Sequence, residues 1–344
     1  MAEPDQAPCC GRPRGYRRLL AAFMFALAVA LSAYVLIDAT KANRLAFASV
    51  WFLAVLPAFL SALICYVGDP AGDRSSGFYW GIPPILVGIV VIGSACFLHE
   101  GVICLIMLSP VWLISGWIGA FVLRARRNRA GSGNVLQCSL LLLPLAAGAV
   151  ESQIPYPYER VTLVRSIRIR ATPAEIWPFT LSNAHITDTE GGWTFAQNIA
   201  GIPRPRETRL RGVGPGATRT AYWGDSIDFD EIITDWQPEK RLAWKFSFTN
   251  SSLENYTDQH IAPDGQFLKI DSGDYTLRSL GPDITLLTLR TNYIAKTHVN
   301  TYAKLWGEVL LGGVQDNILA ILQQRAEVTH RMTAAAITQL PHPP

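Results

Sequence analysis

Long apolar runs without a single charged residue dominate the first 150 residues and constrain the fold more than any other feature. A bilayer core about 30 Å thick requires about 20 helical residues, with a usable minimum near 17. Backbone groups surrounded by lipid must be hydrogen-bonded within their own segment, so each run should be a helix. The runs predict an all-α transmembrane bundle of four to five helices over residues 19–150. The predicted spans are residues 19–37, 45–67, 78–98, 102–123 and the shorter 135–150.

Basic residues indicate how this bundle is oriented. If the N-terminal tail, residues 1–18, is cytoplasmic, the inside segments carry nine Lys and Arg residues and the outside segments carry two. This asymmetry predicts a cytoplasmic N-terminus. A signal peptide is the alternative for the first run, but that run is longer than a usual signal sequence and three more follow it. The inside segments are 1–18, 68–77 and 124–134, and the outside segments are 38–44 and 99–101.

The fifth run, residues 135–150, decides the location of everything after it. If it spans the membrane, the second half of the chain is extracytoplasmic, which is the arrangement we expect. If it lies along the membrane surface, the second half stays cytoplasmic. The sequence thus predicts a multi-pass protein of a bacterial inner membrane, with the lipid bilayer as a partner.

The second half has the composition of a soluble domain. Residues 151–344 contain 21 acidic and 19 basic residues, whereas residues 1–150 contain 6 and 11. The net charge of +3 therefore comes from the first half, and the second half offers no electrostatic footprint for nucleic acid. All six cysteines lie in the first half, which excludes a disulfide-stapled second domain.

A short proline-containing linker, residues 151–160, separates the halves. Residues 161–169 alternate between apolar and polar, as in a strand with one buried face. Thr172, Pro173 and Glu175 then form a helix start, with a capping box between Thr172 and Glu175. Further strands are predicted at 208–211, 217–223, 226–236, 241–249, 266–280 and 283–295.

A long amphipathic helix, residues 300–327, closes the domain, and residues 330–344 are expected to be a disordered tail. Gly312 and Gly313 are unusual inside a helix and indicate either close backbone approach or tolerance. A curved antiparallel sheet around this helix would bury both apolar faces and leave a cavity between them. The predicted fold class of the second half is therefore α+β.

The second half resembles the START-like superfamily, also called SRPBCC or the polyketide cyclase/dehydrase and lipid transport group, over residues 161–329. The resemblance rests on the helix start at Thr172, the Gly212-Val213-Gly214-Pro215-Gly216 turn, the segment Trp236-Gln237-Pro238-Glu239-Lys240-Arg241-Leu242 and the closing helix. It implies a helix-grip fold with a deep apolar pocket for a hydrophobic small molecule. The superfamily includes lipid carriers, hormone receptors, aromatase/cyclases and oxygenase subunits, and the fold alone does not choose among them.

Residues on the inward face of the curved sheet and on the closing helix are the candidates for this pocket. Glu231 has two interpretations, because a carboxylate on an apolar strand face either lies on the outer surface or supplies a polar contact in the pocket. We expect the outer surface, because the sequence pattern leaves the strand parity open by one residue. The ligand-pocket candidates are Tyr222, Phe229, Glu231, Trp244, Phe246, Phe248, Tyr275, Tyr293, Trp306 and Leu310.

No metal or cofactor is expected. His185, His260 and His298 are far apart in the sequence, without the spacing that would suggest an iron site. The sequence contains no nucleophile elbow, phosphate-binding loop, HExxH or dinucleotide-binding glycine pattern.

The leading hypothesis is a non-catalytic, membrane-tethered binder of a lipid or polyketide-like molecule, because such ligands partition into the adjacent bilayer. The second is a cyclase or hydrolase using the same cavity, which requires a buried acid–base group such as Glu231, Asp228, Tyr222 or His260. The third is a membrane sensor in which the soluble domain detects the ligand.

Overall fold

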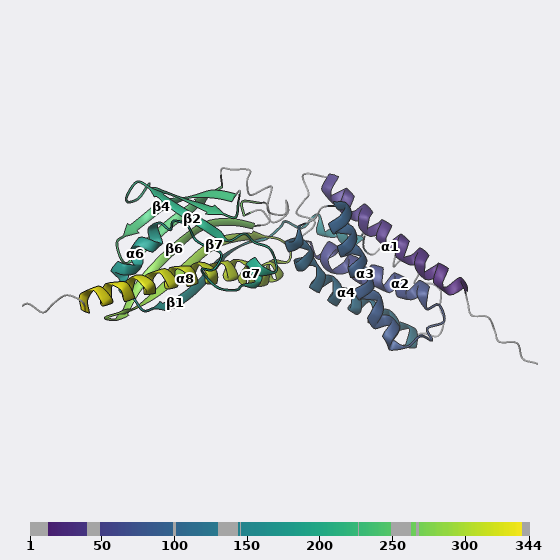
Figure 1. Ribbon diagram of the computed structural model, residues 1–344. Helices are drawn as coiled ribbons and strands as arrows, with labels where there is room; N and C mark the ends of the chain where they lie inside the picture. Colours follow the sequence, from purple (N-terminus) through teal and green to yellow (C-terminus); the bar gives the residue numbers. More distant parts are fainter. Residues whose placement is uncertain are drawn as a thin grey trace, which may run out of the picture. The chain divides into compact units, whose positions relative to one another are not determined.

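The computed structural model describes residues 13–39, 49–98, 101–129, 144, 146–225, 227–248, 263–265 and 268–338 (Figure 1). The chain divides into two compact units. The first comprises Met1–His99 and Met107–Pro155, and the second comprises Glu100–Ile106 and Tyr156–Pro344. Each unit is described by itself.

The first unit is helical wherever its structure is regular. Its elements are α1 (Pro13–Ala39), a π-helical turn η2 (Trp51–Val55) continuing into α2 (Leu56–Gly68), α3 (Ser76–Gly93), a second π-helical turn η3 (Ser94–Leu98) and, from residue 107 onward, α4 (Val102–Arg129). These helices contain the first, third and fourth predicted apolar runs and residues 51–67 of the second. Of the fifth run, residues 144 and 146–150 are helical, and the remainder lies outside the described residues. The helix α1 also includes residues 13–18, which were predicted as part of the N-terminal tail.

Five described helices are long and apolar enough to cross a membrane. Four lie in the first unit, and the fifth is the last helix of the second unit, α8 (Asn300–Thr338). The apolar stretches are Tyr16–Ala33, Trp51–Gly68, Ser76–Cys96, Val102–Asn128 and Asn300–Ala336.

Two polar contacts mark opposite ends of the helix formed by η2 and α2. At its C-terminal end, Arg127 of α4 donates to the carbonyl oxygens of Tyr66 and Asp69. At its N-terminal end, the Glu151 carboxylate accepts hydrogen bonds from the backbone N–H groups of Val50 and Trp51, each at 2.7 Å. These N–H groups belong to the first turn of a helix, which has no intrahelical acceptors for them. With a rise of 1.5 Å per residue, the two ends of this helix are about 27 Å apart.

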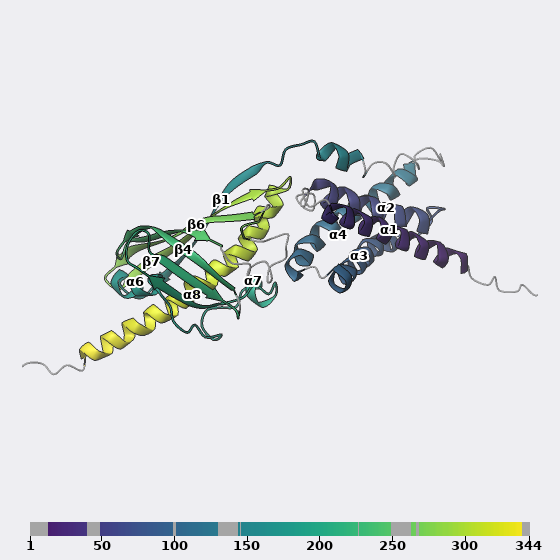
Figure 2. The ribbon, with the colours of Figure 1, turned by 90° about the horizontal axis from the view of Figure 1, so that it is seen from above.

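The second unit contains one seven-stranded antiparallel sheet with strand order β1-β7-β6-β5-β4-β3-β2. Figures 1 and 2 show α8 lying along one face of this sheet. The strands are β1 (Tyr158–Ile169), β2 (Pro205–Arg211), β3 (Thr218–Trp223), β4 (Ile227–Gln237), β5 (Arg241–Ser247), β6 (Leu268–Gly281) and β7 (Ile284–Lys296). Short helices α6 (Pro173–Leu181) and α7 (Phe195–Asn198) follow β1.

Most of these elements agree with the sequence pattern. The capping box is confirmed, because the Glu175 N–H donates to Thr172 Oγ1 and the Thr172 N–H donates to the Glu175 carboxylate.

The prediction for the end of the chain was wrong. The final helix continues to Thr338, through residues expected to be a disordered tail, because residues 328–338 contain no proline or glycine and include three consecutive alanines.

The sheet, α6 and α8 enclose one hydrophobic core. We call it the core cluster, and its buried members include Ile169 of β1, Leu287 of β7, Leu242 of β5, Ile176 of α6 and Leu322 of α8. Each of these five side chains is at most 2% exposed. The face of the sheet that carries them is therefore the inner face, toward α8.

The glycine pair in α8 is explained by close approach on two sides. A Cβ on Gly312 would lie 2.5 Å from the Arg165 guanidinium of β1, and a Cβ on Gly313 would lie 3.1 Å from Ala196 of α7. The pair lets α8 pack between the sheet edge and α7, which compensates for its cost of roughly 1 kcal/mol per glycine in a helix interior.

The connection between α6 and β2 is fastened to the C-terminal half of α8. Arg325 donates to the Glu190 carboxylate and to the carbonyl oxygens of Ala184 and His185. Asn317 accepts a hydrogen bond from the Gly192 N–H at 2.8 Å. These contacts hold the connection over the part of α8 that also contributes to the core cluster.

Candidate functional site

The aromatic patch, which consists of Trp223, Phe229, Phe246 and Phe248, occupies one end of the inner face. Successive residues of a strand alternate between faces, and Phe246 packs against the core cluster, which puts Phe248 on the same face. Glu231 is directly opposite Phe246, so Phe229, two residues away, also faces inward. Trp223 joins the group through ring contact with Phe229.

The rings of the aromatic patch are in mutual contact but incompletely covered. Phe246 and Phe248 stack at 5.8 Å between centroids, and Phe229 lies 6.0 Å and 5.6 Å from them. The Trp223 ring lies 5.9 Å from that of Phe229. All four side chains are only half-buried, in contrast to the core cluster. The patch is therefore an apolar surface, facing inward, that the described parts of the fold leave partly uncovered.

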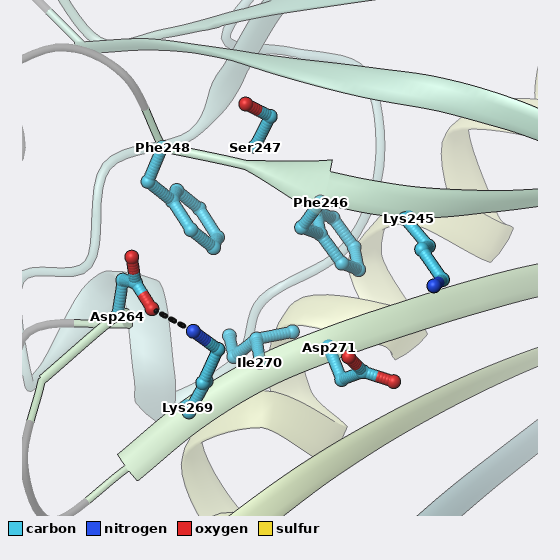
Figure 3. Close-up of a pocket in the computed structure, with 8 residues that line it drawn as sticks. All are labelled: Lys245, Phe246, Ser247, Phe248, Asp264, Lys269, Ile270 and Asp271. Carbon is cyan, nitrogen blue, oxygen red and sulfur yellow. Dashed lines mark ion pairs between the residues drawn. The ribbon is translucent and has the colours of Figure 1, made fainter. Parts of the chain in front are cut away.

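A gap between two neighbouring strands lies beside this patch. Pairing of β5 with β6 runs from Arg241↔Thr276 to Lys245↔Ser272 and ends there, although β6 continues to pair with β7 as far as Leu268. We call this gap the β5–β6 opening. It holds a pocket of about 330 Å³, within the roughly 300–1,000 Å³ typical of ligand sites. Its lining residues are Lys245, Phe246, Ser247, Phe248, Asp264, Lys269, Ile270 and Asp271 (Figure 3).

A buried ion pair lies next to the aromatic patch. Arg219 of β3 and Glu231 of β4 are cross-strand neighbours, and the Arg219 guanidinium donates to the Glu231 carboxylate and to the carbonyl oxygen of Thr180. The side chains are 5% and 8% exposed. The guanidinium also lies over the rings of Trp244 and Tyr275, 4.5 Å and 5.5 Å from their centroids. Arg219 is thus surrounded by groups that favour its positive charge.

Burial changes the protonation behaviour of this cluster. It raises the pKa of the Glu231 carboxyl above its usual range, although the Arg219 charge acts in the opposite direction. Burial raises the pKa of the Tyr275 hydroxyl to about 12, so it is protonated at neutral pH. Glu231 is thus a buried carboxyl group beside the aromatic patch whose pKa is raised.

The expectation that Glu231 lies on the outer surface was wrong. It points to the inner face and is 6% exposed. An unpaired carboxylate would be costly there, but Arg219 lies directly opposite and compensates its charge. The alternation Ala217, Arg219, Ala221 gave no sign of an inward-facing strand surface, because an arginine between two alanines is typical of the exposed face.

Tyr222 is the candidate that the structure places on the wrong face for a pocket. It is opposite Asp228, and the Arg209 guanidinium lies 5.2 Å from its ring centroid. Both contacts are on the outer face. Its neighbour Trp223, not predicted, joins the aromatic patch instead. The prediction was displaced by one residue along β3, and one residue is sufficient to exchange the two faces of a strand.

The other candidates lie in three places. Phe229, Phe246 and Phe248 come together in the aromatic patch, whereas Trp244 and Tyr275 are fully packed in the core cluster. Tyr293 is 2% exposed and Leu310 is 9% exposed. Trp306 is half-buried on α8, with its ring 6.4 Å from Phe195 and 6.3 Å from Tyr302.

The histidines in the described part of the chain do not gather at this site. His298 stacks on Tyr156 at 4.1 Å, His185 occupies a loop with positive φ, and His260 lies outside the described residues. In the described ranges, no three His, Cys, Asp or Glu side chains are grouped so that they could hold a metal ion.

Comparison with known proteins gives similarity at the level of structure only. No family model matches the sequence, and no curated protein matches it. One similar solved structure is the Zhui aromatase/cyclase from a Streptomyces species, with 15% identity, TM-score 0.32 and coverage of 52% of this chain and 98% of that one. Another is truncated norcoclaurine synthase from Thalictrum flavum, with 12% identity, TM-score 0.28 and coverage of 47% and 92%.

A third is the di-domain aromatase/cyclase BexL, with 14% identity, TM-score 0.33 and coverage of 62% of this chain and 63% of that one. At these identities and TM-scores, the similarities carry no inference about ligand or activity. The functional argument therefore rests on the geometry of this chain.

Proposed function

We propose that this chain is a membrane-anchored protein whose second unit binds a hydrophobic small molecule, of lipid or polyketide-like character, against the aromatic patch. The observation that carries the proposal is the incomplete burial of four contacting aromatic rings on the inner face of the sheet. In the core cluster, by contrast, large side chains such as Leu242 and Leu287 are fully buried.

The energetics favour an apolar ligand. Each 100 Å² of apolar surface removed from water contributes about 2.5 kcal/mol. Aromatic rings also add offset and edge contacts with a planar or unsaturated ligand. The β5–β6 opening adds a concave space beside Phe246 and Phe248. Aromatic rings together with a neighbouring concavity are typical of small-molecule sites.

Native mass spectrometry of the full chain, released from detergent in the gas phase, tests the proposal. We expect one apolar molecule bound per chain, and its loss from the variant Phe248→Asp. Trp193→Asp is the matched control, because Trp193 is an aromatic residue of the same unit that is 69% exposed. A wild-type mass equal to that of the polypeptide alone, after purification and after incubation with lipid extract, would contradict the proposal.

The apolar helices of the first unit support anchoring in a membrane. Apolar side chains such as Met24, Ile92 and Ile118 are at least half exposed on the helices of this unit. Exposed residues of this type are expected on a surface that faces lipid. Extraction with alkaline carbonate should leave the full chain in the membrane pellet.

Two contacts support an extracytoplasmic location for the second unit. Arg127 contacts the end of α2 at Asp69, where the Lys and Arg count predicts the cytoplasmic side. Glu151 contacts the opposite end of the same helix, at Val50 and Trp51. The chain therefore leaves the first unit at the end opposite to Arg127. This arrangement favours a fifth crossing between residues 129 and 151.

Alkaline phosphatase fusions test this orientation, because the enzyme is active only outside the cytoplasm. We expect activity for a fusion after residue 338 and none for a fusion after residue 129. Activity in the reverse pattern would overturn the orientation without affecting the binding proposal.

An acid–base enzyme is the second candidate function, and buried Glu231 is the observation that favours it. Its carboxyl has a raised pKa and lies directly opposite Phe246 of the aromatic patch. If the protein is an enzyme, Glu231→Gln should retain an unconverted substrate where the wild type retains a product, as seen by mass spectrometry of the extracted ligand. Asp228→Asn, on the outer face, is the control. The same extracted molecule from all three proteins would favour binding without catalysis.

A further inference from the structure

The rim of the β5–β6 opening carries charges of both signs. Lys245 and Ser247 lie on the β5 side, and Lys269 and Asp271 lie on the β6 side. Asp264 completes the rim and forms an ion pair with Lys269 at 2.9 Å, which leaves that pair mutually neutralised. Figure 3 shows this pair near Phe248, with Lys245 and Asp271 toward the other end of the pocket.

Lys245 and Asp271 are the two charges of the rim that have no ion pair within the described part of the chain. Both residues are exposed, and they lie on opposite sides of the opening. The rim therefore presents one cation and one anion outside that ion pair, each next to the same small pocket, and the Asp271 charge also favours the charged form of Lys269. Both charged residues line the pocket itself.

The floor of the same pocket is apolar. Phe246 and Phe248 come from β5, and Ile270 comes from β6. Ile270 is the cross-strand partner of Tyr293, a buried residue of the inner face, so the floor is continuous with that face. A molecule in the opening thus meets charged groups at the rim and aromatic rings below.

We propose that the β5–β6 opening binds a single-chain membrane lipid with a zwitterionic headgroup, and this proposal rests on the function proposed above. The acyl chain contacts Phe246, Phe248 and Ile270. The headgroup lies at the rim, with its anionic phosphate toward Lys245 and its cationic ammonium toward Asp271. An anionic headgroup would meet the Asp271 carboxylate without compensation, and an uncharged one would leave both charges unused.

Photocrosslinking in the full chain tests this proposal directly. The chain is reconstituted in phosphatidylglycerol nanodiscs with benzoylphenylalanine in place of Phe248 or, in a second variant, Ile270. The probes are equimolar, isotopically labelled lysophosphatidylethanolamine, lysophosphatidylglycerol and monoacylglycerol with the same acyl chain. Benzoylphenylalanine in place of Tyr222, on the outer face, measures non-specific labelling. Adducts are quantified by mass spectrometry.

We expect the zwitterionic probe to exceed each of the others by roughly three- to fivefold at both positions, the range expected for exposed ion pairs. The preference should fall as salt is raised, because exposed charges are screened. Asp271→Lys, an exposed change outside the core, should transfer the preference to lysophosphatidylglycerol. Ser247→Ala at the same rim should leave it unchanged.

The outcomes separate the headgroup proposal from the hydrophobic binding proposed in the preceding subsection. Equal labelling by all three probes, above the Tyr222 control, or a preference that survives Asp271→Lys, overturns the headgroup assignment and leaves hydrophobic binding intact. Labelling at Phe248 and Ile270 no greater than at Tyr222 counts against both.

Discussion

The two ends of the inner sheet face are built from the same strands but differ in how completely their side chains are buried. Ala217, directly before β3, belongs to the core cluster, and Trp223 at the end of β3 belongs to the aromatic patch. On β4, Ile233 is 1% exposed, whereas Phe229 is half-buried. Leu242 near the start of β5 is fully buried, and Phe248, directly after β5, lines the pocket. We call the part of the inner face that belongs to the core cluster the sealed end, and the part occupied by the aromatic patch the open end. Each strand passes from one to the other within a few residues.

The difference between the ends lies in what covers them. Ile176 and Trp177 of α6 and Leu322 of α8 complete the core cluster at the sealed end. The four side chains of the aromatic patch, at the open end, remain only half-buried. The Arg219–Glu231 pair lies at the boundary between the two. Apolar residues at the sealed end contribute mainly to stability, and those at the open end are available to a ligand.

The largest expected effect is at the boundary. Glu231→Leu leaves the buried Arg219 charge without its partner and should lower the free energy of unfolding by about 3–5 kcal/mol. The double variant Arg219→Met with Glu231→Leu should recover most of this loss, because both charges are removed together. Urea unfolding of the full chain in detergent, followed by tryptophan fluorescence, measures both. If the double variant were no more stable than Glu231→Leu, the loss would have to come from packing.

A pair of truncations should separate the two ends. Leu287→Ala at the sealed end should cost about 2–5 kcal/mol, because it leaves a cavity among fully buried side chains. Phe248→Ala at the open end should cost less than about 1 kcal/mol but should reduce ligand occupancy in native mass spectra by roughly tenfold. Equal losses of stability would mean that the aromatic patch is ordinary core, and the comparison between the two ends would fail.

The sequence best predicted those elements whose pattern extends beyond a single residue. The alternation in β1 and the apolar stripe of α8 each repeat over many positions, so local errors do not alter the element. The capping box at Thr172 is a local motif with a fixed spacing to Glu175. The inner and outer faces of β3 and β4 depend on single positions. There the apolar period is interrupted by Arg219 and Glu231, and the compensation between them appears only when the strands pair.

The β5–β6 opening could not be predicted from the sequence, because it arises from the end of a strand pairing. Lys245 and Asp271 are distant in sequence and resemble ordinary exposed strand residues. Their proximity to one pocket follows from the register Lys245↔Ser272. Pairing registers depend on turn geometry and on long-range contacts, which a single sequence does not specify.

The connection between α6 and β2, which lies over α8, should have a smaller effect on stability, and that effect depends on pH. Hydrogen bonding to Arg325 lowers the pKa of the Glu190 carboxyl from 4.5 to about 2, despite the opposing effect of burial. Because the folded pKa is the lower one, the stabilisation is complete above about pH 4.5 and is lost as the pH falls toward 2.

At pH 7, Glu190→Gln should therefore cost about 1.5–3 kcal/mol, as expected for hydrogen bonds to a charged group. The difference from the wild type should shrink steadily below pH 4.5, which denaturation at pH 7, 4 and 3 would measure. Ligand occupancy at neutral pH should not change, because Glu190 belongs to the segment over the sealed end. A difference in stability that stays constant down to pH 3 would contradict the role of the charge.

The smallest effect concerns the helix that closes the sealed end. Thr172→Ala removes the side-chain acceptor for the Glu175 N–H at the start of α6 and should cost about 1 kcal/mol. Thr162→Ala, an exposed threonine of β1 bonded to Asn292, is the control and should stay within about 0.5 kcal/mol of the wild type. Because α6 contributes Ile176 and Trp177 only to the core cluster, Thr172→Ala should leave binding at the aromatic patch unchanged. Loss of ligand together with this small loss of stability would show that the two ends are coupled through α6, and the separation between them would have to be abandoned.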